Sequence, residues 1–205
     1  MTLTEEFLRH AARLLAERDP HLAAVFERLG SPPLWNREPG FGTLVYIILE
    51  QQVSLASARA AYGRLLAALS PLNPTGFLTL SDEALRAIGF SRQKTLYSRG
   101  LARAILEGDL DLDALPGMEE ADVRAALTRL KGIGNWTADI YLMEALLLPD
   151  IWPTTDLALK AAIRSVKGLP VMPSDQQLEE IGQLYRPWRS VAARMFWHHY
   201  LHPMV

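Results

Sequence analysis

A short glycine turn between two expected helices is the first feature of this sequence that could bind a ligand. In the segment LKGIGNWTADIY (130–141), Gly132 and Gly134 flank a single isoleucine. Glycine tolerates positive φ and carries no Cβ, so the backbone can turn tightly and a phosphate can approach it. A helix that starts near Asn135 directs unpaired N–H groups at such an anion, and Lys131 adds a positive charge. A contact of this kind holds a nucleic-acid backbone without reading its sequence.

Each chemically suggestive group also has a structural interpretation. The glycine turn can equally be an αα-hairpin with a glycine C-cap, and the segment alone leaves both interpretations open. Asp156, in WPTTDLALK, can cap the helix that follows, as can the two threonines before it. The histidines near the C-terminal end partly fit one helical face, but no carboxylate joins them in a zinc-binding pattern. We therefore expect surface histidines at His198, His199 and His202.

The composition excludes several kinds of chemistry. The 205 residues contain no cysteine, which removes disulfides, thiol catalysis, cysteine-bound zinc and iron–sulfur clusters. A hydrophobic share of 49% predicts a sizeable core. The formal charge of -2 neither predicts nor excludes DNA binding, because binding depends on a local patch. The charged N-terminal segment is not a signal peptide, and no apolar run can span a bilayer, so we expect a cytoplasmic protein, nucleoid-associated if bacterial.

The elements that must position these groups read as helices throughout. Apolar residues recur at helical spacing in roughly ten short segments, and no segment predicts a strand, so the expected fold is all-α. The longest helical region is expected at 43–69. Its β-branched, apolar first half also permits a strand, but we prefer a buried helix because the run continues without a turn into an alanine-rich half. Ser81 and Ser91 are expected to cap the helices that follow them, and Pro187 is expected to open the last helix.

Charge is segregated along the chain. Residues 84–106 contain basic residues and no acid: Arg86, Arg92, Lys94, Arg99 and Arg103. Residues 107–123 contain acidic residues and no base. Two interpretations follow: two solvated surfaces, or a basic DNA-facing side beside an acidic outer face.

Four segments, taken in order, resemble the HhH-GPD DNA glycosylase superfamily. They are FGTLVYIILEQQVSLASA (41–58), LKGIGNWTADIYL (130–142), WPTTDLALK (152–160) and PWRSVAARMFWHHY (187–200). The last resembles the C-terminal helix of the AlkA-type branch, the 3-methyladenine DNA glycosylase II group. Two departures are evident: Lys131 replaces the usual hairpin proline, and the chain has no room for the mixed α/β N-terminal domain that AlkA proteins often carry. We expect the shorter, purely helical version.

The resemblance implies an arrangement of lobes and a set of site residues. One glycosylase unit is expected over 1–205, with lobe A at 37–149, its hairpin at 127–143, lobe B at 1–36 plus 150–205, and a cleft between the lobes. The implied catalytic residue is Asp156, and Gln52 is the implied intercalating residue, although it can also satisfy backbone groups at a helix end. The implied base pocket contains Phe41, Trp136, Ile140 and Trp197, with Ile140 at the position of a family tyrosine. The DNA backbone contacts are Lys131, Gly132 and Gly134.

The resemblance also implies a cation site and a reaction. Main-chain carbonyls of Thr128, Leu130 and Ile133 are expected to hold a monovalent cation, Na⁺ or K⁺, and no other cofactor is required. A carboxylate stabilises the positive charge that develops on the sugar as a glycosidic bond breaks. Aromatic faces attract bases made cationic by alkylation. Bifunctional members have a Schiff-base lysine at the position of Trp136, so a monofunctional enzyme is expected.

The resulting hypothesis is a monomeric base-excision DNA repair glycosylase without membrane contact. It flips alkylated purines of the 3-methyladenine and 7-methylguanine type out of double-stranded DNA and removes them hydrolytically, leaving an abasic site. Three alternatives stay open: a glycosylase for deaminated or oxidised bases, a non-catalytic DNA-binding module, and a helical interaction protein without a nucleic-acid role.

Overall fold

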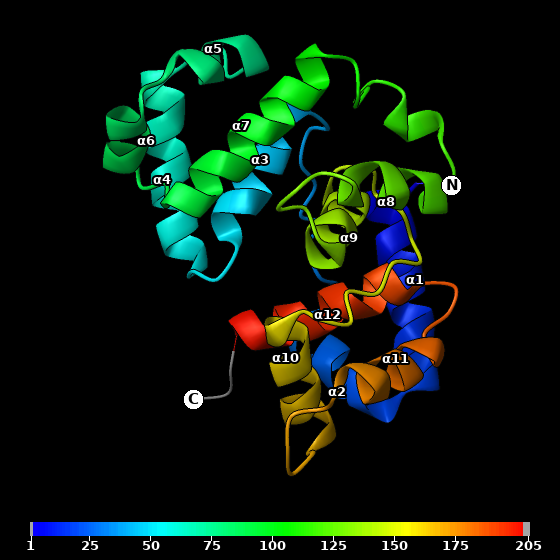
Figure 1. Cartoon of the computed structure of the whole chain (residues 1–205). Helices are drawn as coiled ribbons and strands as arrows, with labels where there is room; N and C mark the ends of the chain where they lie inside the picture. The colour runs from blue at the N-terminus through cyan, green and yellow to red at the C-terminus, as the bar shows by residue number, and fades with distance from the viewer. Residues whose placement is uncertain (1, 203–205) are drawn as a thin grey trace. The chain divides into compact units, whose positions relative to one another are not determined.

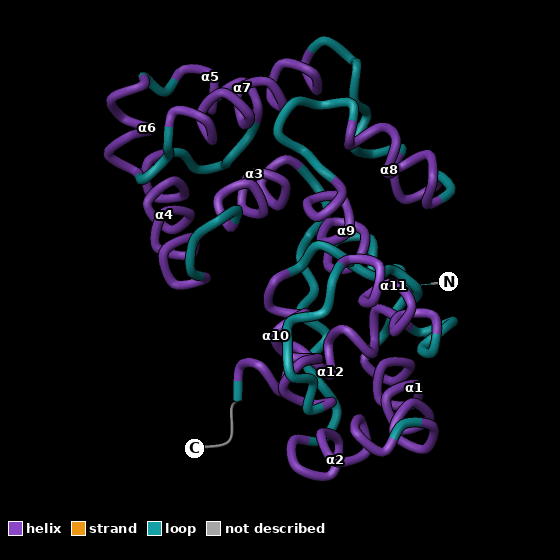
Figure 2. Tube along the Cα trace, turned by 60° about the horizontal axis from the view of Figure 1, so that its bottom comes forward, coloured by secondary structure: helices purple, strands orange, loops and turns teal. Residues whose placement is uncertain are grey.

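The computed structural model describes residues 2–202, and these form twelve α-helices and one short 3₁₀ helix with no strand (Figures 1 and 2). The expected all-α fold is confirmed, with twelve α-helices in place of roughly ten. The helices group into two compact units. Unit 1 contains the residues up to Asn36 and those from Leu142 onward, and unit 2 is Arg37–Tyr141, whereas the expected lobe A extended to residue 149.

Unit 2 contains α3 (Phe41–Glu50), α4 (Leu55–Ala68), α5 (Pro74–Thr79), α6 (Asp82–Ile88), α7 (Arg92–Leu106), the 3₁₀ helix η1 (Leu115–Gly117), α8 (Glu120–Thr128) and the start of α9 (Asn135–Glu144). Its core includes an aromatic cluster in which Phe77 packs against Phe41 and Phe90. Ser81 and Ser91 cap α6 and α7 as predicted, because each side chain accepts a hydrogen bond from a first-turn N–H group.

One expectation for this unit was wrong: the region 43–69 is two helices. α3 ends at Glu50 and α4 begins at Leu55. Between them Gln52 adopts a positive φ of 57°, and the Ser54 hydroxyl accepts a hydrogen bond from the Ser57 N–H group. A serine that caps a new helix start competes with continuation of the old helix, and apolar periodicity does not reveal that competition.

Unit 1 contains α1 (Glu5–Arg18), α2 (Pro20–Leu29), α10 (Leu157–Lys167), α11 (Asp175–Gln183) and α12 (Arg189–Leu201). α12 is its central helix: ten of its thirteen residues are buried, and it packs against α1, α2 and α10. It begins at Arg189 and not at the expected Pro187. None of the described helices is long and apolar enough to cross a lipid bilayer.

The central position of α12 overturns the expectation of surface histidines for two of the three. His198 and His199 are 9% and 7% exposed, and only His202 lies on the surface. The His199 ring contacts the Arg28 guanidinium at 2.9 Å and the Ser165 hydroxyl at 3.0 Å. Burial lowers the pKa of both rings, because desolvation penalises the charged imidazolium. The expectation failed because packing, and not local polarity, decides which face of a helix is buried.

Candidate active site and nucleic-acid interface

Asp156 is the N-cap of α10, and its buried carboxylate is held by hydrogen bonds within unit 1. The residue is 8% exposed, and its Oδ1 accepts a hydrogen bond from the Leu159 N–H group at 2.6 Å. The same oxygen accepts a hydrogen bond from the Trp197 indole N–H at 3.0 Å. The predicted capping role is confirmed, and two residues separated by 41 positions in the chain are in direct contact. Two donors fix the orientation of the carboxylate and leave it little freedom to rotate.

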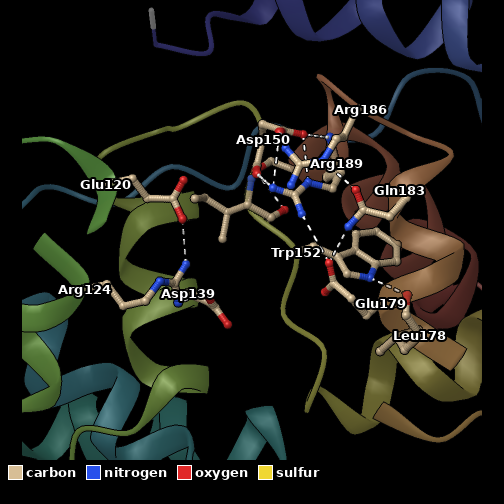
Figure 3. Close-up of polar contacts among 12 residues, drawn as sticks. Glu120, Arg124, Asp139, Asp150, Trp152, Leu178, Glu179, Gln183, Arg186 and Arg189 are labelled. Atoms are coloured by element: carbon tan, nitrogen blue, oxygen red, sulfur yellow. Dashed lines mark hydrogen bonds and ion pairs between the residues drawn. The ribbon is translucent and has the colours of Figure 1, made fainter. Parts of the chain in front are cut away.

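The segment that carries Asp156 is attached to α12 by reciprocal hydrogen bonds. The Ile151 N–H group donates to the Ser190 hydroxyl at 2.9 Å, and the Ser190 N–H group donates to the Pro149 carbonyl at 3.0 Å. Further along, the Trp152 indole N–H donates to the Leu178 carbonyl at 2.8 Å (Figure 3). The segment leading to Asp156 is therefore bonded to α12 through Ser190 and to α11 through Leu178.

A charged cluster at Asp150 holds the start of the same segment. Asp150 accepts hydrogen bonds from Arg186 at 2.6 Å and from the Arg189 Nε–H at 2.9 Å, as Figure 3 shows. Arg189 also donates to the Asp150 main-chain carbonyl at 2.6 Å. A planar guanidinium that bonds both side chain and backbone restrains position and direction together. Sequence reasoning missed Asp150 and Ser190 as supports of Asp156, because their partners lie 36 to 39 residues away.

In unit 2, α8, the turn 129–134 and α9 form the hairpin. Gly132 has a φ of 94°, and a Cβ atom built there would lie 2.0 Å from the Tyr97 ring of α7. Gly134 is different: a Cβ there would meet nothing within 4 Å. The two glycines have different roles. Gly132 allows the turn to pack on Tyr97, whereas Gly134 leaves the backbone open to approach.

The start of α9 has the properties expected of an anion site. Lys131, Gly134 and Asn135 are exposed, and the Gly134 carbonyl accepts the first bond of the helix, from Ala138, at 3.1 Å. The Arg124 guanidinium of α8 bonds Asp139 of α9 at 2.5 Å and so braces the two helices of the hairpin (Figure 3). A helix start with this exposure presents its first-turn N–H groups and the positive end of its dipole in the way that favours an anion such as phosphate.

The turn between α3 and α4, residues 51–54, is called the tip. Gln52 at the tip is exposed and left-handed, a conformation that costs a residue with a Cβ about 1 kcal/mol or more. The neighbouring Gln51 side chain explains how the tip is held: its Nε2 donates to the Gly132 carbonyl at 2.9 Å and to the Thr137 hydroxyl at 3.0 Å. Gln51 therefore bonds a main-chain carbonyl of the hairpin, and its side chain connects the tip to the hairpin.

The other residues expected in the base pocket differ in exposure. Trp136 is half-buried in the first turn of α9, and Ile140, one turn later, is 4% exposed. Phe41 is 6% exposed and packs edge-to-face on Phe77 with ring centroids 5.7 Å apart, so it contributes to the core of unit 2. The hydroxyl of Tyr141, next to Ile140 in the sequence, accepts a hydrogen bond from the Gly40 N–H group at 3.1 Å.

Comparison with known proteins gives the same answer as the motifs. Residues 45–187 match the family described as HhH-GPD superfamily base excision DNA repair protein. DNA-3-methyladenine glycosylase 2 of Escherichia coli is 30% identical over 83% of this chain and 63% of its own length. The chain spans 64% and 42% of the lengths of two further curated relatives, from Bacillus subtilis and Mycobacterium tuberculosis.

Solved structures agree on the fold. A DNA-3-methyladenine glycosidase from Bacillus halodurans is 30% identical, with a TM-score of 0.76 over 93% of this chain and 88% of that one. A Schizosaccharomyces pombe 3-methyladenine DNA glycosylase in complex with abasic DNA is 24% identical, with a TM-score of 0.87 over 92% and 95% of the two chains. The hairpin, the capped aspartate and the matched length together lead to one conclusion: the chain belongs to the HhH-GPD superfamily of base excision DNA repair proteins.

Proposed function

We propose that this protein is a monofunctional DNA glycosylase that flips alkylated purines out of double-stranded DNA and removes them by hydrolysis. The products are a free base of the 3-methyladenine or 7-methylguanine type and an abasic site. The observation that carries the proposal is the buried Asp156 carboxylate, oriented by the Leu159 and Trp197 N–H groups. The names of the relatives from Escherichia coli and Bacillus halodurans support the substrate class.

The role of Asp156 follows from the charge that develops during the reaction. Breaking an N-glycosidic bond leaves positive charge on the sugar, and a carboxylate already held in position stabilises that charge without reorganising. Asp156 also orients the attacking water or accepts its proton. Because Trp197 bonds the same carboxylate oxygen that caps α10, the carboxylate stays aligned while the sugar changes charge.

The leaving group explains the aromatic residues. A purine alkylated on a ring nitrogen carries a positive charge, and the face of a tryptophan attracts a cation by about 0.5–2 kcal/mol, depending on desolvation. Trp136 and Trp197 are the residues assigned to this task. Stacking on an aromatic face does not require one hydrogen-bond pattern, which suits a broad range of alkylated bases.

The DNA is held by backbone contacts at the hairpin and by insertion at the tip. The first-turn N–H groups of α9 and the Lys131 ammonium bind phosphate, and open space at Gly134 lets the phosphate approach. Gln52, exposed at the tip, fills the gap left by the flipped base. The protein acts as a monomer on DNA.

We also assign a Na⁺ or K⁺ ion to the main-chain carbonyls of Thr128, Leu130 and Ile133. Carbonyl oxygens are the hard ligands that such ions take. The Leu130 carbonyl already accepts the Ile133 N–H at 3.1 Å, and a carbonyl has a second lone pair for a cation. The ion would supply positive charge beside the bound phosphate. No other cofactor is required.

The deciding experiment is the release of free bases from alkylated duplex DNA, with Asp156→Asn in parallel. Methylated purines are expected from the wild type, with a rate loss of at least about 100-fold in the variant, because the carboxylate charge is lost. The product strand is expected to stay intact, since no lysine stands at the position of Trp136, and borohydride is expected to trap no adduct.

Other outcomes separate the alternatives. DNA binding without release of any alkylated base would overturn the proposal, and release of deaminated or oxidised bases would then identify a different lesion class. Equal release by Asp156→Asn would remove Asp156 from the chemistry. Strand cleavage that depends on a lysine of this chain would show a bifunctional enzyme.

A further inference from the structure

Arg194 of α12 is a fully buried arginine, and each of its three side-chain nitrogens donates to a main-chain carbonyl. Its exposed fraction is 0%. Nε–H donates to the Leu34 carbonyl at 2.9 Å, one terminal nitrogen donates to Met143 at 2.6 Å, and the other donates to Ser190 at 3.1 Å. Burial is costly for a guanidinium, and it lowers the pKa of Arg194 to about 10, partly offset by the nearby Glu144 carboxylate. A side chain retained at such a cost needs an explanation.

The positions of two of these carbonyls supply one. The chain passes from unit 1 to unit 2 between Asn36 and Arg37, and it returns between Tyr141 and Leu142. Leu34 lies just before the first passage, and Met143 lies just after the second. One guanidinium therefore bonds both connecting segments, which are 109 residues apart (143 − 34).

Arg194 also shares a helical face with two residues of the candidate site. Ser190, Arg194 and Trp197 are spaced i, i+4 and i+7, so they lie along one side of α12. Ser190 bonds the segment before Asp156, and Trp197 bonds the Asp156 carboxylate. Between them, Arg194 bonds the two connecting segments.

We propose that Arg194 is a positioning residue that fixes where both connecting segments leave unit 1, in register with the α12 face that holds Asp156. The idea rests on the proposed glycosylase function, because the segments lead to the hairpin and tip that would hold the DNA. A misplacement of about 1 Å between a catalytic group and a bound substrate can reduce the rate about 100-fold. Arg194 thus acts on the reaction through geometry and touches neither base nor sugar.

The test compares Arg194→Lys with Phe196→Leu by hydrogen exchange and by base release. Lysine keeps the charge, but its three N–H donors share one nitrogen, which cannot reach the three carbonyls that arginine contacts with three separate nitrogens. Faster exchange is expected in peptides covering 33–37 and 140–146 together. The rate constant for base release under saturating enzyme is expected to fall at least tenfold, while the Kd for DNA changes less than about threefold.

Phe196→Leu is the matched control. Phe196 is equally buried on α12, but its aromatic contacts are with Trp152 and Tyr185. At a comparable loss of Tm, it should leave exchange at both connecting segments unchanged and reduce base release less than threefold. If Arg194→Lys fails to fold, the double variant Arg194→Met with Glu144→Gln replaces it, since it removes the charge of the nearby Glu144 carboxylate together with that of Arg194.

The two proposals fail in different ways. Without any base release by the wild type, the exchange measurement still decides the role of Arg194 in the connecting segments. Exchange that is unchanged in the Arg194 variants, or faster in only one segment, would overturn the positioning role. So would loosening of both segments by Phe196→Leu to the same extent.

Discussion

At the scale of single residues, Asp156 combines a structural and a proposed chemical task in one carboxylate. The oxygen that caps α10 is the oxygen that receives the Trp197 N–H group. Capping needs only an acceptor, whereas stabilisation of a cationic sugar needs the negative charge. The two tasks can therefore be separated by substitutions that keep or remove the acceptor.

The free energy of unfolding of Asp156→Asn is expected to lie within about 0.5 kcal/mol of the wild-type value, because the amide oxygen still caps α10. Asp156→Ala removes the acceptor and should lower the free energy of unfolding by about 1 kcal/mol. Both variants should lose base release equally. Urea unfolding followed by circular dichroism measures the stability of each variant. An equal loss of stability in Asp156→Asn and Asp156→Ala would contradict the capping role.

At the scale of elements, unit 2 joins the hairpin to its neighbours through small, specific contacts. Gly132 rests against Tyr97 of α7, and Gln51 of the tip bonds the Gly132 carbonyl. The exposed Gly134, by contrast, has no neighbour that a Cβ would meet. The hairpin glycines should consequently respond differently to the same substitution.

Gly132→Ala is expected to lower the free energy of unfolding by about 2 kcal/mol or more, because its Cβ would overlap the Tyr97 ring at positive φ. Gly134→Ala should leave stability nearly unchanged and weaken DNA binding several-fold, since the methyl group obstructs a phosphate. Thermal unfolding and fluorescence anisotropy with duplex DNA measure the two effects. Equal stability of the two variants would argue against the Tyr97 contact.

In unit 1, Asp19 joins elements that are distant in sequence. Its carboxylate caps α2, pairs with Lys167 at the end of α10 at 2.8 Å, and accepts a hydrogen bond from Tyr185 at 2.7 Å. Burial raises the pKa of Asp19, but the hydrogen bonds from Lys167, Tyr185 and the His21 N–H outweigh it, so the pKa lies below its ordinary value. The ionised form is favoured in the folded protein.

The stabilisation from Asp19 should therefore be present above pH 4 and be lost as the pH falls through the depressed pKa of the folded state. Asp19→Asn is expected to cost about 1 kcal/mol at pH 7, with a difference from wild type that shrinks below pH 4. Urea unfolding from pH 7 to pH 3 checks this. A difference that stays constant across that range would refute the ionic role.

At the scale of the whole molecule, the formal charge of -2 conceals an uneven distribution. Part of the basic stretch 84–106 serves internal contacts: Arg99 pairs with Asp82, and the Lys94 ammonium donates to the Leu49 carbonyl at 2.7 Å. Arg86, Arg92 and Arg103 are exposed. A nearly neutral protein must bind DNA through a few local contacts, so each of them should be visible in the salt dependence.

Lys131→Gln is expected to weaken DNA binding similarly for all sequences and to reduce the slope of log Kd against log salt by about one, the value for one lost phosphate contact. Arg13→Gln, an exposed position on α1 with the same change of charge, is the control and should leave the slope unchanged. Anisotropy titrations at several NaCl concentrations measure both slopes. Equal slopes for the two variants would remove Lys131 from the interface.

The sequence by itself determined the features that depend on neighbouring residues. Helical periodicity and the caps at Ser81 and Ser91 gave the all-α fold, since a serine side chain bonds N–H groups only three residues away. The turn at Gly132 was visible for the same reason, because glycine is favoured locally where φ is positive. Asp156 as a cap also follows from local order in the chain.

Only the tertiary structure decided which side chains meet across long separations. The break at the tip, the burial of His198 and His199, the place of Phe41 in the core, and the bond of Trp197 to Asp156 all depend on packing between distant helices. Arg194 is the extreme case, because nothing near it in sequence distinguishes it from a surface arginine. Its role arises when α12 is enclosed and two distant carbonyls must be satisfied by one buried donor group.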